Sequence, residues 1–254
     1  MTVPSVAAGY AVLGRTDPVL DRLIKKVGTP DPFAFPDEGR TTGNNFAGMV
    51  LHIVAQQISI KVALVLYDRL IAALDGPPTP GGVLGLDVDH LRAIGMSHSK
   101  AAYLHHLADA VVAGDLAIDA LDAVGDDDVI SALTRVKGIG PWSAEMFLIH
   151  QLKRPDILPA GDLGIRTAVR RAYELTDLPL IADVRRPGAA WSPYRTLAST
   201  LLWRSLLAAG NGRQPAGHIR SAADGDGEVL EEAGELVHRH VRGIEGESLD
   251  DVAR

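Results

Sequence analysis

The 254-residue chain contains no cysteine. Disulfides, thiolate zinc sites and cysteine-ligated iron–sulfur clusters are therefore excluded. Aromatic residues make up only 5% of the chain, so each tryptophan needs an explanation. No apolar run approaches the roughly 20 residues of a membrane helix, and no basic region followed by an apolar stretch opens the sequence. We expect a cytoplasmic protein without membrane contact, associated with the nucleoid if the source is bacterial.

Strand patterns are also missing, because no segment alternates apolar and polar residues convincingly over four or more positions. Apolar residues recur at helical spacing instead, and 46% apolar composition supplies an ample core. The sequence predicts an all-α fold. Helices are expected at about 17–27, 46–74 with a division near 56–59, 88–94, 100–113, 116–124, 126–136, 141–152, 162–175 and 194–209. We expect a poorly ordered start over 1–16, an inter-lobe connection over 75–86 and a basic loop over 184–193.

Charge is distributed unevenly along the chain. The net charge is −7, and residues 221–254 alone carry ten acids and three bases, which accounts for all of it. Residues 131–171 carry seven bases against three acids. A basic segment of this kind is typical of contact with a nucleic-acid backbone. The acidic tail, 210–254, is expected to be partly helical or disordered.

The centre of the basic segment is a glycine-rich turn between two expected helices. Gly138 and Gly140 flank Ile139, and glycines there permit a tight hairpin whose backbone amides stay uncovered. Pro141 suits the first position of the second helix, whose positive end would face the same anion. The pattern predicts a phosphate-binding helix-hairpin-helix, with Lys137 close by. A simple sharp turn between helices is the alternative.

Asp162 follows the turn by some twenty residues and precedes a helix. Its ordinary role would be a helix cap. A carboxylate there could also stabilise positive charge developing on a sugar ring and orient a water for attack. Trp142 and Trp203 are either packing residues or a stacking wall for a nucleobase, where cation–π attraction would favour an alkylated purine. Gln56 and Gln57 are either solvated residues at a helix end or fill the space left by a displaced base.

Four motifs together resemble those of the helix-hairpin-helix DNA glycosylases, and within them the 3-methyladenine DNA glycosylase II family. They are Gln56-Gln57-Ile-Ser59, Gly95-Met-Ser-His-Ser-Lys-Ala101, Val136-Lys-Gly-Ile-Gly-Pro-Trp-Ser-Ala144 and Leu158-Pro-Ala-Gly-Asp162. The resemblance implies a two-lobed helical fold with a glycosylase core over 43–209 and the hairpin at about 126–152. Residues 1–42 would join the lobe formed with the late helices.

The resemblance also implies roles for individual residues. Asp162 falls on the catalytic aspartate, and Gly138 and Gly140 fall on the phosphate-binding hairpin. No metal is expected on side chains, but the hairpin of such proteins can hold a potassium or sodium ion through backbone carbonyls, here near Val136 and Ile139. The remaining residues are assigned to the base pocket (Trp142, Trp203 and Met146) and to DNA binding (Lys137, Gln56, Gln57 and Arg166).

One departure from the wider superfamily bears on the reaction. Bifunctional relatives carry a lysine nucleophile just after the hairpin, where this sequence has Pro141-Trp142. The resemblance therefore implies a monofunctional enzyme that flips alkylated purines such as 3-methyladenine and 7-methylguanine out of damaged double-stranded DNA and hydrolyses the N-glycosidic bond. A monomer is the default expectation. A non-catalytic DNA-binding protein and a glycosylase for deaminated or oxidised bases are the alternatives. The latter would need an acid for a neutral leaving group, and none is evident in the sequence.

Overall fold

The computed structural model of the chain describes residues 5–34 and 37–208, so the expectation for the acidic tail lies outside the described residues. Across these two ranges the secondary structure is helical and no strand occurs, which confirms the predicted all-α class. None of the helices found in this part of the chain is both long enough and apolar enough to cross a membrane.

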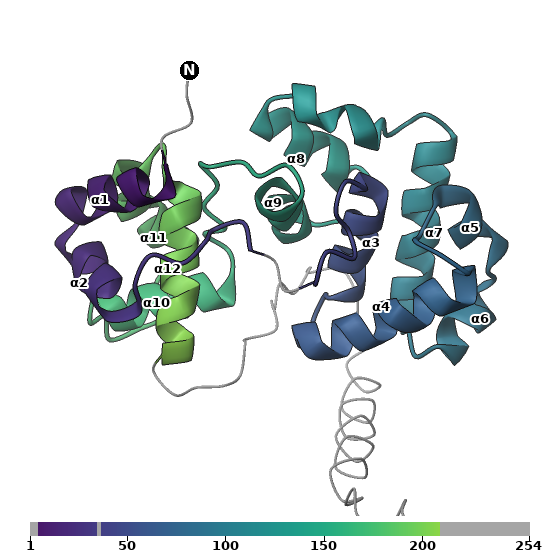
Figure 1. Ribbon diagram of the computed structural model, residues 1–254, viewed down its shortest axis with the longest axis horizontal. Helices are drawn as coiled ribbons and strands as arrows, with labels where there is room; N and C mark the ends of the chain where they lie inside the picture. The colour runs from purple at the N-terminus through teal and green to yellow at the C-terminus, as the bar shows by residue number, and fades with distance from the viewer. Residues whose placement is uncertain (1–4, 35–36, 209–254) are drawn as a thin grey trace, which may run out of the picture. The chain divides into compact units, whose positions relative to one another are not determined.

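One hydrophobic cluster is built from the middle of the chain (Figure 1). Phe147, Leu148 and Ile149 of the central helix α9 are fully buried in it, together with most residues of α3. Its elements are α3 (Asn45–Val54), α4 (Ile60–Leu74), α5 (Pro80–Gly85), α6 (Val88–Ala93), α7 (His98–Val112), the 3-10 helix η1 (Ile118–Ala123), α8 (Asp126–Thr134) and α9 (Pro141–His150).

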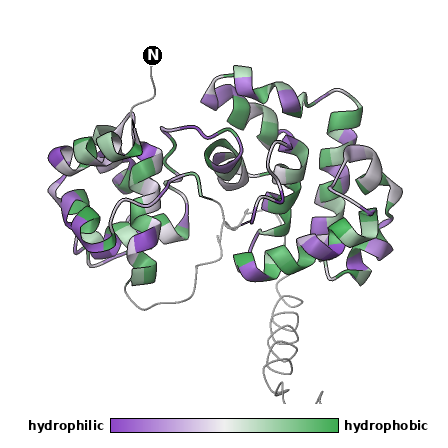
Figure 2. Ribbon diagram, in the orientation of Figure 1, coloured by the Kyte–Doolittle hydropathy of each residue, from purple (hydrophilic) through white to green (hydrophobic). Residues whose placement is uncertain are grey.

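A second cluster joins the first two helices to the last three α-helices. Tyr10, Leu20 and Trp191 are almost completely buried in it. Figure 2 shows both hydrophobic and hydrophilic positions on these helices, and in α12 the residues 196–202 are all buried. The elements are α1 (Val6–Thr16), α2 (Pro18–Val27), α10 (Leu163–Ala172), α11 (Ile181–Gly188), the 3-10 helix η2 (Ala189–Trp191) and α12 (Arg195–Ala208).

Side-chain caps define where most of these helices begin. An oxygen of the residue before the helix accepts a hydrogen bond from a backbone N–H of the first turn, which satisfies a donor that has no partner inside the helix. The helices α8 and α9 lie on either side of the glycine turn. Their N-cap residues are Gly125 and Gly140, which have no side chain to cap the helix. The capping residues elsewhere are Ser5, Asp17, Asn44, Ser59, Thr79, Asp87, Ser97 and Asp162.

The expected poorly ordered start is wrong for residues 6–16, which form α1. Ser5 caps this helix by accepting a hydrogen bond from Ala8 N at 3.3 Å, and Tyr10 and Leu13 are each 1% exposed. Their spacing is helical, and the second cluster buries them. The packing that stabilises α1 comes from helices far away in the sequence, so the short segment alone did not reveal it.

Two expected loops are also helical. Residues 75–86 do not connect the clusters, because they contain α5, which Thr79 and Pro80 start and whose Val83 is buried against the first cluster. Residues 184–193 contain most of α11 and all of η2. Pro187 lies inside the last turn of α11, where it has no N–H to donate to the carbonyl of Asp183, so this short helix lacks one of its hydrogen bonds.

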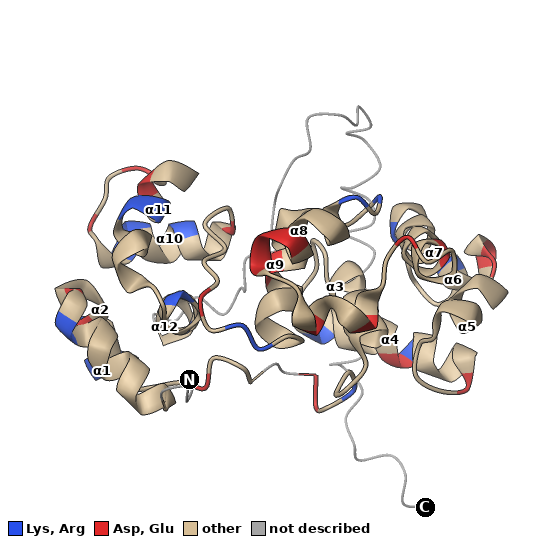
Figure 3. Ribbon diagram, turned by 90° about the horizontal axis from the view of Figure 1, so that it is seen from above, with Lys and Arg blue, Asp and Glu red and all other residues tan. Residues whose placement is uncertain are grey.

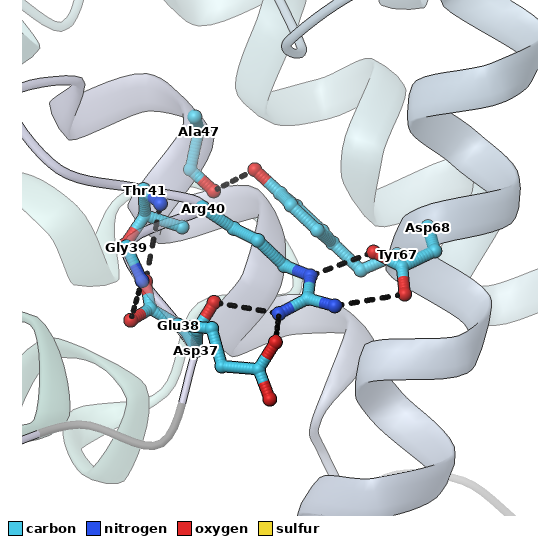
Figure 4. A network of polar contacts seen from close by, with 8 residues as sticks. All are labelled: Asp37, Glu38, Gly39, Arg40, Thr41, Ala47, Tyr67 and Asp68. Carbon is cyan, nitrogen blue, oxygen red and sulfur yellow. Dashed lines mark hydrogen bonds and ion pairs between the residues drawn. The ribbon is translucent and has the colours of Figure 1, made fainter.

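The segment that leads from α2 into α3 is fixed by a polar network (Figure 4). Asp37 is 7% exposed and accepts hydrogen bonds from the Thr41 hydroxyl at 2.6 Å and the Gly39 amide at 3.1 Å. Arg40 donates from Nε and Nη2 to the two carboxylate oxygens of Asp68 in α4. This bidentate pair ties the segment to the first cluster.

Candidate active site

The turn between α8 and α9 is a tight hairpin whose outer side is open. Gly138 has φ +98°, and a Cβ atom on it would lie 2.1 Å from the Tyr103 ring, so only glycine fits. A Cβ on Gly140 would meet no atom within 4 Å. Gly140 supplies no side chain to the first turn of α9, so amides of that turn remain available to an anion. Lys137 is exposed beside them.

Asp162 is the N-cap of α10 and is 6% exposed. Its Oδ1 accepts hydrogen bonds from Ile165 N at 2.8 Å and from Trp203 Nε1 at 2.9 Å. Its Oδ2 accepts one from Trp142 Nε1 at 2.8 Å. Asp162 can therefore cap α10 and also act on a ligand. The capping bond uses one lone pair of Oδ1, and Oδ2 keeps acceptor capacity.

The two tryptophans bring three helices together at this carboxylate. Trp142 is the second residue of α9 and packs on the first hydrophobic cluster. Trp203 lies in α12 and packs against both clusters. Both side chains are half-buried. The carboxylate therefore lies where the two clusters meet, with an aromatic side chain from each side.

Gln56 and Gln57 lie in the turn after α3 and differ in their surroundings. Gln56 donates its amide to the carbonyl of Gly138 at 2.9 Å and to Ser143 Oγ at 3.0 Å, so it holds the hairpin from inside. Gln57 is exposed and has φ +60°, a conformation that costs free energy in any residue other than glycine. The same turn is supported by Lys100, whose Nζ donates to Val54 O at 2.8 Å.

Two other predicted site residues lie away from the carboxylate's hydrogen bonds. Met146 is 6% exposed and belongs to the first hydrophobic cluster. Arg166 is half-buried in α10 and donates from Nε to Pro179 O at 2.8 Å. The assignments of Met146 to the base pocket and of Arg166 to DNA stay predictions.

Sequence analysis gave no role to Glu145, whose charge interacts with that of Asp162, or to Arg185, which interacts with Glu145. Glu145 lies one helical turn after Trp142 in α9 and is partly buried. Burial raises the pKa of Glu145, Arg185 lowers it and the charge of Asp162 raises it, and the net result is a pKa of about 8. Arg185 is exposed on α11, in a region where Figure 3 shows basic residues on α10 and α11. The helical spacing from Trp142 was the only signal for Glu145, and Arg185 fell in the segment expected to be a loop.

Two surface hollows in the described part of the chain lie away from the carboxylate of Asp162. One, about 690 Å³, lies between α10 and α11 and is lined by residues from Val169 to Pro187. Another lies between α1 and α2. Neither is lined by Asp162, Trp142 or Trp203. Asp162 is 6% exposed, and the two indoles hold its carboxylate by hydrogen bonds.

Several proteins of known name are similar to this chain in sequence. A Bacillus subtilis (strain 168) protein named as a DNA-3-methyladenine glycosylase is 32% identical over 165 residues, which are 62% of this chain and 58% of that protein. The chain therefore spans little more than half of that relative. The DNA-3-methyladenine glycosylase 1 of Schizosaccharomyces pombe is 29% identical over 206 residues, 80% of this chain and 89% of its own length.

A solved structure agrees with these relatives. The 3-methyladenine DNA glycosylase of Schizosaccharomyces pombe in complex with abasic DNA superposes with a TM-score of 0.71 at 28% identity, over 79% of this chain and 97% of that one. The sequence profile of one family, the HhH-GPD superfamily base excision DNA repair proteins, matches residues 50–191. This match begins in α3, contains the hairpin and Asp162, and ends at Trp191. The chain belongs to the HhH-GPD superfamily of base excision DNA repair proteins.

Proposed function

We propose that this chain is a DNA glycosylase of the 3-methyladenine II type, which removes alkylated purines from damaged duplex DNA and leaves an abasic site without cutting the strand. The observation that carries the proposal is the position of Asp162. Two indole N–H groups and a helix amide fix this carboxylate where the two clusters meet. Relatives named DNA-3-methyladenine glycosylase support the substrate class.

The chemistry requires one carboxylate. As the bond between C1′ and the purine breaks, positive charge develops on the sugar, and a negative group beside it lowers the barrier. The Oδ2 atom of Asp162 is suited to this task because it accepts only one hydrogen bond within the described residues. An alkylated purine is already cationic, so it departs without being protonated. Water then attacks C1′ and loses its proton.

The hairpin is the proposed contact with the DNA backbone. The uncapped first turn of α9 offers amides to a phosphate, and Lys137 adds an exposed positive charge. Gln57 is the exposed member of the glutamine pair and therefore the better candidate for the space left by a flipped base. Gln56 serves this function indirectly, because its amide holds the Gly138 carbonyl.

The absence of lyase activity is proposed from the residues after the hairpin. A lyase step needs an amine that forms a Schiff base with the sugar, and Pro141 and Trp142 have none. Among the relatives of this fold, a named 8-oxoguanine glycosylase/lyase shares only 14% identity and supports the fold alone. A water molecule oriented by Asp162 is the nucleophile in our proposal.

A monovalent cation at the hairpin is a further part of the proposal. The carbonyls of Val136 and Gly138 each accept one hydrogen bond, from Ile139 N and from Gln56. A carbonyl oxygen has two lone pairs, so each retains one for a potassium or sodium ion. The donor set fits such an ion, which would help to neutralise a bound phosphate. No step of hydrolysis depends on it.

The test is the release of free bases from methylated duplex DNA, with strand nicking followed before and after alkali. We expect the native chain to release 3-methyladenine and 7-methylguanine and to produce nicks only after alkali. Asp162→Asn should release neither base. Nicks before alkali would contradict the monofunctional assignment. If both proteins bind the DNA and neither releases a base, the chain is a DNA-binding module and the proposal fails.

A further inference from the structure

The helix α11 lies along the segment that carries Asp162. At the start of this helix, Ile181 Cδ1 would lie 3.8 Å from a Cβ atom on Gly161, the residue before Asp162. At its end the packing is closer still, because a Cβ atom on Gly188 would lie 2.2 Å from Leu158 Cδ2. Both ends of α11 therefore contact the short segment that leads into the carboxylate.

Several contacts hold α11 in this place. Val184, in the middle of the helix, is 0% exposed and packs in the second cluster. Arg166 of α10 donates from Nε to the carbonyl of Pro179 at 2.8 Å, which fixes the turn before the helix. The amide of Leu180 donates to Asp183 Oδ2 at 3.3 Å in the first turn. A helix held at its buried face and at its start presents its exposed side chains in defined positions.

Two adjacent arginines of α11 are exposed and project in different directions. Arg185 follows Ile181 by four residues, so it lies on the side of the helix that meets the Asp162 segment. Arg186 is turned by about 100° around the helix axis. It donates to Asp183 Oδ1 at 2.9 Å and lines the hollow that lies away from the carboxylate. Arg185 neither lines that hollow nor forms an ion pair within the described part of the chain.

The surroundings of Arg185 are basic. The helix α10 contains three arginines and α11 contains two, against the single acidic residue Asp183, and Figure 3 shows basic residues on both helices. The charge of Arg185 also acts on the first cluster, because it lowers the pKa of Glu145 in α9. A guanidinium in such surroundings suits a phosphate, to whose oxygens it donates two parallel hydrogen bonds.

The proposed reaction creates a need for positive charge at this place. A nucleotide whose C1′ atom faces Asp162 brings the phosphates on either side of its sugar toward a carboxylate of the same sign, and like charges repel. The hairpin would contact the backbone from the first cluster. Arg185 supplies a cation from the second cluster, in which α10 and α11 pack. The DNA backbone could thus be held by both clusters.

We propose that Arg185 binds a phosphate that flanks the flipped nucleotide, so that α11 is a second contact with the DNA backbone in addition to the hairpin. The proposal rests on the function proposed above, because the nucleotide comes to α11 only when its base has left the duplex. Arg185 is a binding residue in this account and takes no part in bond cleavage.

The first measurement is the affinity for a duplex that contains one tetrahydrofuran residue, a stable analogue of an abasic site, at several salt concentrations. Arg185→Gln should bind about tenfold more weakly at low salt, and the slope of log Kd against log salt concentration should decrease by about 0.9, the contribution of one phosphate. Arg186→Gln is the matched control, because it removes the same charge from the next residue of the same helix. Its slope should stay close to the native slope.

The second measurement identifies the phosphate. A neutral methylphosphonate replaces, one at a time, the phosphate on the 5′ side and the phosphate on the 3′ side of the tetrahydrofuran residue. One of these replacements should weaken binding by the native chain and by Arg186→Gln about tenfold. The same replacement should change binding by Arg185→Gln less than about twofold, because that phosphate has already lost its partner.

Two results would overturn the inference. One is an equal loss of affinity and of salt dependence in Arg185→Gln and Arg186→Gln. The other is a methylphosphonate effect that is the same in all three proteins at both phosphates. Release of 7-methylguanine by the native chain is measured in parallel. If the native chain releases the base and either result is found, only the α11 contact is wrong, whereas a native chain that releases no base contradicts the proposed function itself.

Discussion

Two aspartates in this molecule have nearly the same local chemistry and different consequences. Asp17 and Asp162 each cap a helix, and each accepts a hydrogen bond from a tryptophan indole. Asp17 receives four donors: Val19 N, Leu20 N, the Tyr173 hydroxyl and Trp191 Nε1. Its acceptor capacity is largely used. Trp191 is 0% exposed, so this group is a structural junction of the second cluster.

Asp162 differs in two respects. Within residues 5–34 and 37–208 it receives three donors, of which one reaches Oδ2, and both of its tryptophan partners, Trp142 and Trp203, are half-buried. It also joins residues of both hydrophobic clusters, whereas Asp17 joins residues of the second cluster alone. Remaining acceptor capacity and accessible aromatic partners distinguish a carboxylate that can act on a ligand from one that only holds the fold.

The largest expected effect is on activity, at Asp162. Asp162→Ala should slow base release by about 10²–10³-fold, because the developing positive charge on the sugar loses its partner. The same change removes the cap of α10 and should lower the free energy of unfolding by about 1 kcal/mol. Single-turnover excision of 7-methylguanine and urea unfolding measure the two effects. Excision within threefold of the native rate would show that Asp162, like Asp17, only holds the fold.

The next largest effect is on stability, at Asp17. Asp17→Ala removes the cap of α2 and leaves Trp191 Nε1 without its acceptor, so the free energy of unfolding should fall by about 2–3 kcal/mol. The excision rate of the remaining folded protein should stay native. Urea titration with excision measured at full folding tests this. A stable but inactive Asp17→Ala protein would show that the second cluster takes part in the chemistry.

A matched pair of tryptophan substitutions sharpens the comparison. Trp142→Phe removes the one donor to Asp162 Oδ2 among the described residues, so the carboxylate is held less firmly and excision should slow about tenfold. Trp191→Phe removes one of four donors to Asp17 and should instead lower the free energy of unfolding by about 1–2 kcal/mol. Each variant is measured in both assays. If both changed only stability, Trp142 would be a packing residue.

The smallest effect is in the pH dependence of stability. Burial raises the pKa of Asp17, but hydrogen bonds from Tyr173, Trp191 and the α2 amides outweigh it, so the pKa lies below its ordinary value of 3.8. The folded state therefore releases this proton more readily than the unfolded state. The stabilisation is complete above pH 3.8 and is lost as the pH falls through the folded pKa.

Asp17→Asn provides the measurement for this effect. The difference in urea midpoint between native and variant protein should be largest near neutral pH and should shrink in acid. The exposed Asp177→Asn is the matched control and should give no such trend. A difference that stays constant down to strongly acidic pH would show that the charge of Asp17 does not contribute.

The sequence predicted much of the fold because local signals and packing agree. Asp126–Thr134, Pro141–His150 and Arg195–Ala208 form helices close to the predicted bounds. The start of the chain and the residues around 80 and 187 were predicted wrongly. Distant clusters stabilise α1 and α5, and a proline in the last turn hid α11. Tertiary contacts of this kind cannot be read from a short stretch of sequence.

The candidate site was predictable to a similar extent. Gly138, Gly140 and Asp162 could be assigned from the sequence, because a turn and a helix cap are local features. The convergence of Trp142 and Trp203 on one carboxylate depends on packing between segments some sixty residues apart, so only their residue type pointed to the site beforehand. Glu145 was missed because its burial and its electrostatic interaction with Asp162 exist only in the folded chain.

The most direct test of the central claim is the rate of 7-methylguanine release by Asp162→Asn and Asp17→Asn under identical single-turnover conditions. Asparagine keeps the size and one capping oxygen at both positions, removes the charge and replaces the second acceptor oxygen by an NH2 group. The account predicts a folded Asp162→Asn protein that releases base at least about 100-fold more slowly than native, and an Asp17→Asn protein with the native rate. Equal rates for the two variants would contradict the assignment of Asp162 as the catalytic carboxylate.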